Sequence, residues 1–228
     1  MVGLQSTVSK ISEAGSARCL ILESSVPGVF SAGADLKERQ EMSDGGVMSF
    51  LAHLKHLISS LESLPVPVLA AVDGPALGGG LELLLGCDLI VSSERAVFGQ
   101  PETGLGVMPG AGGTVRLAGI IGPSRAANII LAGQRITGEQ AEQWGLVARV
   151  VNHQDLQQTT RELARNIIRA APRALTMAKY SLQSARFLSK AAALELETAC
   201  YANLLSTTDR REGLLAWAQR RPPAFTGE

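Results

Sequence analysis

The sequence lacks an excess of charge of either sign. Its 228 residues contain 21 Lys and Arg against 21 Asp and Glu, so the formal net charge is zero. Proteins that bind nucleic acids or anionic membrane surfaces through their overall field usually carry a basic excess or a basic patch. The charge balance therefore argues against both classes, and an anionic partner would have to be held by local groups.

Long apolar runs and metal-binding motifs are also missing. No stretch of eighteen apolar residues occurs, so no membrane span is predicted. The three cysteines (Cys19, Cys87 and Cys200) lie in apolar stretches without CxxC or CxxH spacing, which is typical of buried free thiols in a reducing compartment. His53 and His56 have HxxH spacing, but no third ligand is spaced to join them, and we expect no metal site.

The apolar residues that are present alternate between strand-like and helix-like segments. Strands are predicted at 18–23, 66–72, 88–93 and 96–100, with a helix of three-and-four periodicity between the first two and a short helix at 81–87. A strand, a helix and a strand in this order predict a parallel crossover. Helical segments dominate from about residue 123. We therefore predict an α/β core over residues 1–134 and a helical region over 135–228.

Three consecutive glycines, Gly78 to Gly80, stand where the predicted helix carrying Glu82 begins. The first N–H groups of a helix have no internal partner, and without side chains a ligand oxygen can reach them. Close helix–strand packing or a positive φ is the alternative explanation. Phosphate binding is a third, although GxGxxG and the Gly-Lys-Ser/Thr of a P-loop are both absent.

A second turn of small residues, Ala32 to Ala34, follows the first predicted strand. Turns after parallel strands converge at the carboxyl ends of a sheet, so one N–H group from each turn would make a two-donor oxyanion hole. Glu82, one helical turn beyond Gly79, and Glu102, on a later loop, could share a water molecule as base and acid. Taken singly, each glutamate is more often a solvated surface charge.

Three stretches together resemble the crotonase (enoyl-CoA hydratase) superfamily over essentially the whole chain. They are "FSAGADLKE", "AAVDGPALGGGLELLLGCDLIVSSERAVFGQPETGLGVMPGAGGTVRL" and "TTDRREGLLAWAQRRPPAFTG". Within it the chain is most similar to the mitochondrial enoyl-CoA hydratase-like and methylglutaconyl-CoA hydratase group. The resemblance implies an α/β spiral of βαβ units with a C-terminal helical region for trimerisation and active-site covering, usually a homotrimer or homohexamer. It also implies the mitochondrial matrix for a eukaryotic protein and the cytoplasm for a bacterial one.

The resemblance further implies which residues act. The N–H groups of Ala34 and Gly79 would hold the thioester oxygen of an acyl-CoA. Glu82 would activate water and Glu102 would protonate the α-carbon, so that a 2-enoyl-CoA is hydrated across its 2,3 double bond. This lyase reaction belongs to fatty-acid or branched-chain amino-acid breakdown, including that of leucine, and needs no metal or redox cofactor.

Substrate binding is implied for one loop and one glycine. Gly110 would line the water end of the site. The loop that contacts coenzyme A would contain Ala34, Asp35, Leu36 and Lys37. The residues between the motifs set the acyl-chain preference, and by position alone Met48, Phe50 and Leu51 are candidates to line that pocket.

The chain departs from the family pattern at its start, and this leaves alternatives open. Family members usually carry a strand and a loop upstream of the first helix, whereas "MVGLQSTVSKISEAG" enters partway through that helix, so we expect the N-terminal strands to be missing. An inactive truncated paralogue is one alternative. Another is methylglutaconyl-CoA hydratase with RNA binding through a lysine-rich first helix, but residues 1–18 offer only Lys10 and Arg18. Isomerases and decarboxylases of the superfamily generally lack one of the two glutamates.

Overall fold

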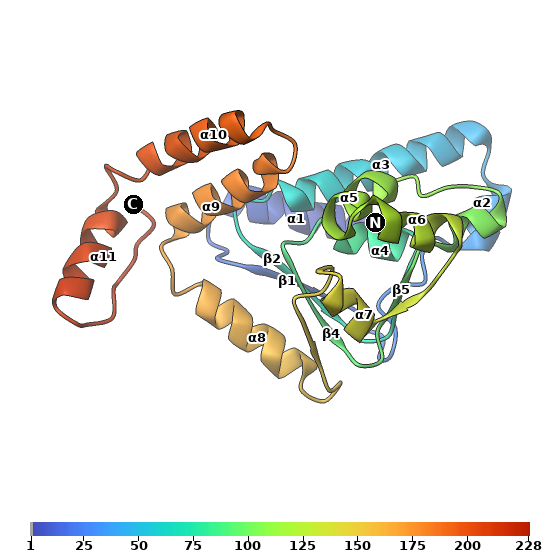
Figure 1. Cartoon of the computed structure of the whole chain (residues 1–228), viewed down its shortest axis with the longest axis horizontal. Helices are drawn as coiled ribbons and strands as arrows, with labels where there is room; N and C mark the ends of the chain where they lie inside the picture. The colour runs from blue at the N-terminus through green and yellow to red at the C-terminus, as the bar shows by residue number, and fades with distance from the viewer. Residues whose placement is uncertain (1) are drawn as a thin grey trace.

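The computed structural model describes residues 2–228 and contains two small sheets enclosed by helices (Figure 1). The first sheet has the order β1-β2-β4-β7 and is parallel throughout. The second has the order β3-β5-β6, with only the β5–β6 pair antiparallel. The strands are β1 (Leu20–Glu23), β2 (Val68–Val72), β3 (Pro75–Leu77), β4 (Leu89–Ser93), β5 (Val97–Gly99), β6 (Ile136–Thr137) and β7 (Arg149–Val151).

Eleven α-helices and one short 3-10 helix complete the described part of the chain. In chain order they are α1 (Val2–Ala14), α2 (Leu36–Glu41), α3 (Asp44–Glu62), α4 (Gly79–Leu84), η1 (Pro101–Leu105), α5 (Gly113–Ile121), α6 (Pro123–Leu131), α7 (Gly138–Gln143), α8 (Leu156–Ile167), α9 (Pro172–Ala185), α10 (Lys190–Ala202) and α11 (Thr208–Ala218).

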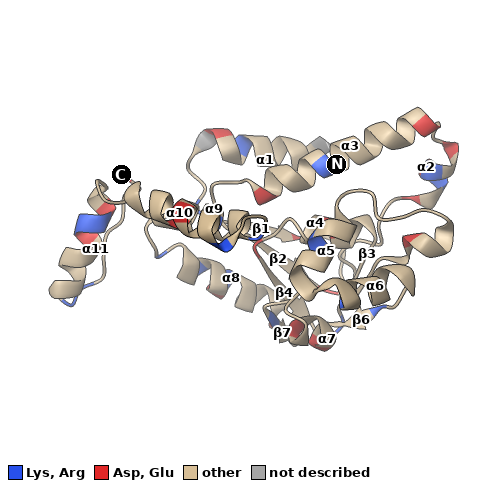
Figure 2. Ribbon diagram, turned by 45° about the horizontal axis from the view of Figure 1, so that its top comes forward, with Lys and Arg blue, Asp and Glu red and all other residues tan. Residues whose placement is uncertain are grey.

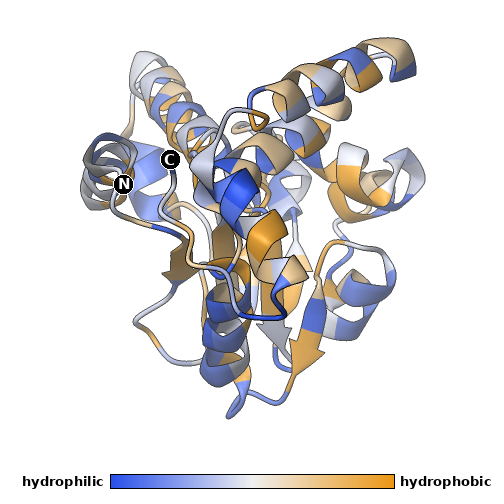
Figure 3. Cartoon of the chain, turned by 90° about the vertical axis from the view of Figure 1, so that its left-hand side faces the viewer, coloured by the Kyte–Doolittle hydropathy of each residue, from blue (hydrophilic) through white to orange (hydrophobic). Residues whose placement is uncertain are grey.

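The first sheet is covered on both faces, as a parallel sheet requires. Every residue of β2 is buried. Val68 packs with α1 and α3, through Val8 and Leu61, whereas Ala71 packs with Leu156 of α8 on the opposite face. The strands stand out as apolar in the hydropathy colouring of Figure 3. The parallel crossover from β1 through α3 to β2 confirms the prediction from the sequence.

The second sheet shares the largest apolar core with α4, α5 and α6. Leu81, Phe98, Leu117 and Ile129 are fully buried in it. The predicted strands and helices all occur, with ends shifted by one to four residues, but the short strands β3, β6 and β7 were not expected. The first sheet includes residues beyond 134, because β7 is one of its edge strands. The division of the chain into two regions near residue 134 stays a prediction.

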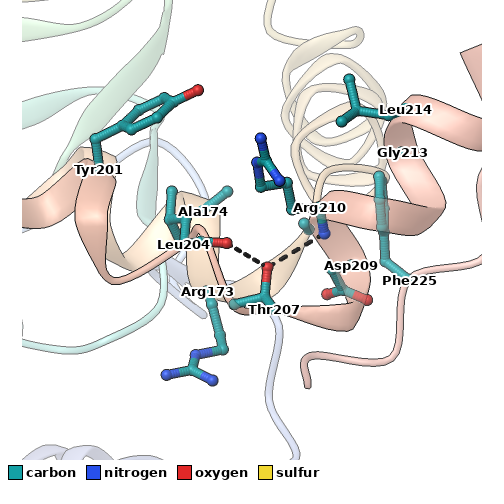
Figure 4. A pocket seen from close by; sticks show the side chains of 11 residues that line it. Arg173, Ala174, Tyr201, Leu204, Thr207, Asp209, Arg210, Gly213, Leu214 and Phe225 are labelled. Atoms are coloured by element: carbon teal, nitrogen blue, oxygen red, sulfur yellow. Dashed lines mark hydrogen bonds between the residues drawn. The ribbon is translucent and has the colours of Figure 1, made fainter.

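Helices α10 and α11 extend away from the sheets (Figure 1), whereas Lys179 of α9 donates to the Val66 carbonyl just before β2. Helices α9, α10 and α11 carry large exposed apolar side chains, among them Leu182, Tyr201 and Trp217, and Phe187 is exposed in the turn between α9 and α10. A cavity of about 330 Å³ lies between these helices and the C-terminal segment. Figure 4 shows its lining, in which the Thr207 hydroxyl donates to the Leu204 carbonyl and accepts from the Arg210 N–H.

The C-terminal segment is fixed to α11 by Asp209, whose side chain is 3% exposed. Its two carboxylate oxygens accept from the N–H groups of Thr226, at 2.8 Å, and Gly227, at 2.9 Å. Asp209→Ala should lower the free energy of unfolding by about 2 kcal/mol, because two enclosed N–H groups lose their acceptor. Thermal unfolding measures the loss, and Asp209→Asn, which keeps one acceptor, should lose less. An Ala variant as stable as the parent would contradict this role.

The three cysteines are free thiols. Burial raises the pKa of the Cys19 thiol to about 11 and that of Cys87 to about 12, so both stay protonated at neutral pH. Cys200 is buried, whereas Cys19 and Cys87 are only half-buried. Across residues 2–228, no three His, Cys, Asp or Glu side chains are grouped closely enough to hold a metal ion. None of the described helices is long and apolar enough to cross a membrane. Acidic and basic residues are scattered over the helices with no large area of one sign (Figure 2).

Candidate active site

The three glycines before Glu82 have three different environments. Gly78 caps α4 with a φ of 53°, a conformation that side chains disfavour. Gly80 allows close packing, since a Cβ atom there would lie 2.6 Å from the Ser31 carbonyl oxygen. Gly79 has neither constraint, because its Cβ would meet only Leu54, at 3.5 Å. Packing and positive φ therefore explain two of the glycines, and Gly79 is left with an accessible backbone.

The second small-residue turn reaches the start of α4, as the sequence predicted. Ser31 forms an isolated parallel bridge with Ala76, and the Leu77 N–H donates to the Ser31 carbonyl at 2.9 Å. A Cβ on Gly33 would lie 3.7 Å from the Gly79 nitrogen. Among residues 2–228, no acceptor bonds the N–H group of Ala34 or of Gly79. Two free donors thus stand on neighbouring turns.

Glu82 is a buried carboxylate with one oxygen fully engaged. Glu82 lies on α4 and is 3% exposed. Oε1 accepts from the N–H groups of Ala111, at 2.7 Å, and Gly113, at 2.8 Å. The described residues donate no hydrogen bond to Oε2. Oε2 therefore remains able to accept a hydrogen bond from a water molecule.

Glu102 approaches the same place from η1. A Cβ on Gly78 would lie 3.1 Å from Glu102 Oε1, so this carboxylate lies against the start of α4. The buried amide of Gln100, with its nitrogen turned toward Glu102, donates to Oε1 at 2.8 Å and to Oε2 at 3.1 Å. Burial raises the pKa of Glu102, and the negative charge of Glu82 raises it further. A carboxyl group with a raised pKa is suited to give up a proton in a reaction near neutral pH.

The raised pKa of Glu102 predicts a pH-dependent cost to stability. A carboxyl group that binds its proton more tightly in the folded state stabilises the fold below its unfolded pKa and loses that contribution as the pH rises through the folded pKa. Glu102→Gln should therefore raise the thermal midpoint at pH 7–8, and the difference should shrink toward pH 4. Differential scanning calorimetry across this range measures it.

Glu212 offers a control of the opposite sign. Its hydrogen bonds from Arg221 lower its pKa to about 2. Glu212→Gln should therefore lower the midpoint at pH 7, and the gap should close as the pH falls toward 2. If Glu102→Gln behaved like Glu212→Gln, the environment assigned to Glu102 would be wrong.

Comparison with known proteins identifies the family of this chain. The Enoyl-CoA hydratase/isomerase family matches residues 3–228. The chain belongs to this family. A solved enoyl-CoA hydratase from Bacillus anthracis is 38% identical and superposes with a TM-score of 0.97, over 100% of this chain and 88% of that one. The chain therefore has the crotonase fold of the enoyl-CoA hydratases.

Curated members of the family include enzymes from fungi and mammals. The enoyl-CoA isomerase/hydratase fer4 of Mycosarcoma maydis is 46% identical over 92% of this chain and 77% of its own length. The mitochondrial methylglutaconyl-CoA hydratase of Mus musculus is 41% identical over 92% of this chain and 68% of its own length. Both bacterial and mitochondrial proteins are thus relatives of this chain.

The loop predicted to contact coenzyme A is exposed. Residues 34–37 are all exposed, and they run into α2. The Asp35 carboxylate caps that helix by accepting from the Lys37 N–H at 2.8 Å. Asp35 therefore shapes the loop, and Ala34, Leu36 and Lys37 are left accessible to a large ligand. The roles of these residues in binding stay predictions.

One candidate for the acyl pocket lies against the candidate for the water end. Gly110 packs on Leu51, whose Cδ2 atom would be 2.6 Å from a Cβ at that position. The guanidinium carbon of Arg39 lies over the Phe50 ring, 4.3 Å from the ring centre, and this contact joins α2 to α3. Met48 is 67% exposed. Of the three proposed acyl-pocket residues, only Leu51 is placed in contact with a predicted site residue.

Three groups of the site were not predicted from the sequence. They are the Gln100 amide and the N–H groups of Ala111 and Gly113. A Cβ on Gly113 would lie 2.8 Å from the Gln100 amide and 3.0 Å from Glu82 Oε1, so the missing side chain gives both groups their space. The glycine-rich "PGAGG" is the signal for this loop in the sequence, and from it only Gly110 is predicted as a site residue.

Proposed function

We propose that this chain is an enoyl-CoA hydratase that adds water across the 2,3 double bond of a 2-enoyl-CoA thioester. The observation that carries the proposal is the meeting of Glu82 and Glu102 beside the free N–H groups of Ala34 and Gly79. Family members named as hydratases support it. The RNA-binding alternative has no comparable support, since Lys10 is the only basic residue of α1.

The site suggests the following chemistry. Oε2 of Glu82 takes a proton from water as the water oxygen bonds to carbon 3 of the substrate. The electrons of the double bond move toward the thioester oxygen, where the N–H groups of Ala34 and Gly79 stabilise the developing negative charge. Carbon 2 then takes a proton from Glu102, which gives a 3-hydroxyacyl-CoA. No metal or redox cofactor is needed, because each charge and proton has a group of this chain to receive it.

A panel of substrates tests the proposal. Crotonyl-CoA, longer 2-enoyl-CoAs and 3-methylglutaconyl-CoA should lose the ultraviolet absorbance of the conjugated thioester when the protein is added. The relative rates would assign the enzyme to fatty-acid or leucine breakdown. An absorbance gain with 3-enoyl-CoA, and no loss with any 2-enoyl-CoA, would identify an isomerase instead.

We also propose that the chain works as a homotrimer or a pair of stacked trimers. The exposed apolar side chains of α9, α10 and α11 support this, because patches of this kind usually lie at interfaces. Sedimentation equilibrium distinguishes a monomer, a trimer and a hexamer. For location we propose the mitochondrial matrix if the source is eukaryotic and the cytoplasm if it is bacterial, in line with relatives of both kinds.

A further inference from the structure

The loop of residues 109–113 determines where the Glu82 carboxylate lies. Both hydrogen bonds to Glu82 Oε1 come from this loop, through the N–H groups of Ala111 and Gly113. Three of its five residues are glycines, which bring no side chain to pack the loop in place. Glycine also leaves a chain more conformational freedom than any other residue. The loop therefore needs support from outside.

Arg116, on α5, provides that support. Its Nη1 donates to the Ala111 carbonyl at 3.2 Å. Its Nε and Nη2 donate to Glu62 Oε2 of α3 at 3.1 and 2.9 Å, and Nη2 also donates to the Ser59 hydroxyl at 3.2 Å. A planar guanidinium held by this set of bonds has a fixed orientation.

The ion pair between Arg116 and Glu62 is largely buried. The side chains of Arg116 and Glu62 are only 14% and 21% exposed, so solvent screens their attraction less than at an open surface. Nη1 of Arg116 occupies the place that a Cβ of Gly112 would take. The guanidinium therefore lies directly against the loop backbone.

Ala111 is held from both sides as a result. Its N–H group donates to Glu82, and its carbonyl accepts from Arg116. The anchor of Arg116 is α3, which also contacts the start of α4 through Leu54. One helix thus supports both the donors to Glu82 and the helix on which Glu82 stands.

We propose that Arg116 is a positioning residue, which with Glu62 clamps the 109–113 loop so that two backbone N–H groups hold Glu82 in its reactive orientation. This inference rests on the proposed function for its effect on rate. Its effect on the loop does not depend on any activity. The Arg116 side chain bonds to Glu62, Ser59 and Ala111, and to neither carboxylate of the site, so it takes no part in proton transfer.

Three variants of the clamp test the inference. Arg116→Met removes all its side-chain bonds, Glu62→Gln removes the anchoring charge, and Arg116→Lys keeps a charge without the fork geometry. Amide hydrogen exchange at Ala111 and Gly113 should speed up at least about tenfold in Arg116→Met. In the same variant kcat for 2-enoyl-CoA hydration should fall about 10- to 100-fold, since small displacements of a reacting group have effects of this size. KM should change by less than about threefold, and Arg116→Lys and Glu62→Gln should fall between Arg116→Met and the parent.

Arg221 provides the matched control. It forms a comparable forked pair with Glu212, on α11 rather than beside Glu82. Arg221→Lys should lower the thermal midpoint but leave kcat and the exchange of Ala111 and Gly113 unchanged. Unchanged exchange in folded Arg116→Met, or in Glu62→Gln if the Met variant does not fold, overturns the inference whether or not the parent is a hydratase. A hydrating parent whose folded clamp variants keep its kcat overturns it as well.

Discussion

Glu82→Gln should lower kcat for hydration of a 2-enoyl-CoA at least about 10²-fold, the effect of losing a positioned base. The amide oxygen of glutamine can still accept from Ala111 and Gly113, which now donate to Oε1 at 2.7 and 2.8 Å. The amide nitrogen would then replace Oε2, and it cannot take a proton from water. The loss should therefore fall on kcat with little change in fold. Stopped-flow absorbance with crotonyl-CoA, alongside circular dichroism, measures both.

Glu102→Gln should cause a loss of similar size by removing the acid. Gln100 would keep an oxygen to donate to, so the η1 turn should hold its place. If either glutamine variant hydrated crotonyl-CoA at a near-normal rate in an active preparation, that glutamate would not have the role proposed for it.

Gly79→Val should reduce hydration at least about 10²- to 10³-fold, the range seen when one oxyanion donor is lost. The two methyl groups of valine branch beside its own N–H group and narrow the approach of the thioester oxygen. Structural cost should be small, because Gly79 has no positive φ and its Cβ would meet only the end of the Leu54 side chain, at 3.5 Å. Rate, thermal midpoint and sedimentation are measured on one preparation.

The neighbouring glycine supplies the control for this experiment. Gly80→Ala places a Cβ 2.6 Å from the Ser31 carbonyl oxygen, which the turn cannot avoid without moving. It should therefore lower the thermal midpoint or the oligomer content first. Gly79→Val that melts early while its folded fraction hydrates normally would assign Gly79 to packing and remove it from the oxyanion hole.

The approach of the two small-residue turns could be predicted, because both turns and the strands before them are visible in the sequence. Each turn follows a parallel strand, and the turns of Gly33 and Gly79 do lie within contact of each other. The strands β3, β6 and β7 could not be predicted in the same way. They are two or three residues long, too short to show a period, and their pairing is set by neighbours distant in the sequence, as when Arg149 to Val151 pair with β4.

Backbone donors account for most of what the sequence did not reveal at the site. The N–H groups of Ala111 and Gly113 bind Glu82, yet every residue except proline has such a group, and only the folded loop selects these two. Gln100 is different, because it stands two residues before the predicted acid Glu102, and its amide is fully buried. Its burial, however, depends on the space left by Gly113, which is not adjacent in sequence.

The hydrogen bonds to Glu82 also bear on the handedness of the product. With Oε1 engaged by two N–H groups, only Oε2 is left to hold the water, so the water meets the flat enoyl group from one side. A thioester held as proposed, by the N–H groups of Ala34 and Gly79, would have to leave both donors to present its other face. The new stereocentre at carbon 3 should therefore form in a single configuration, and chiral chromatography of the 3-hydroxyacyl product would show one enantiomer.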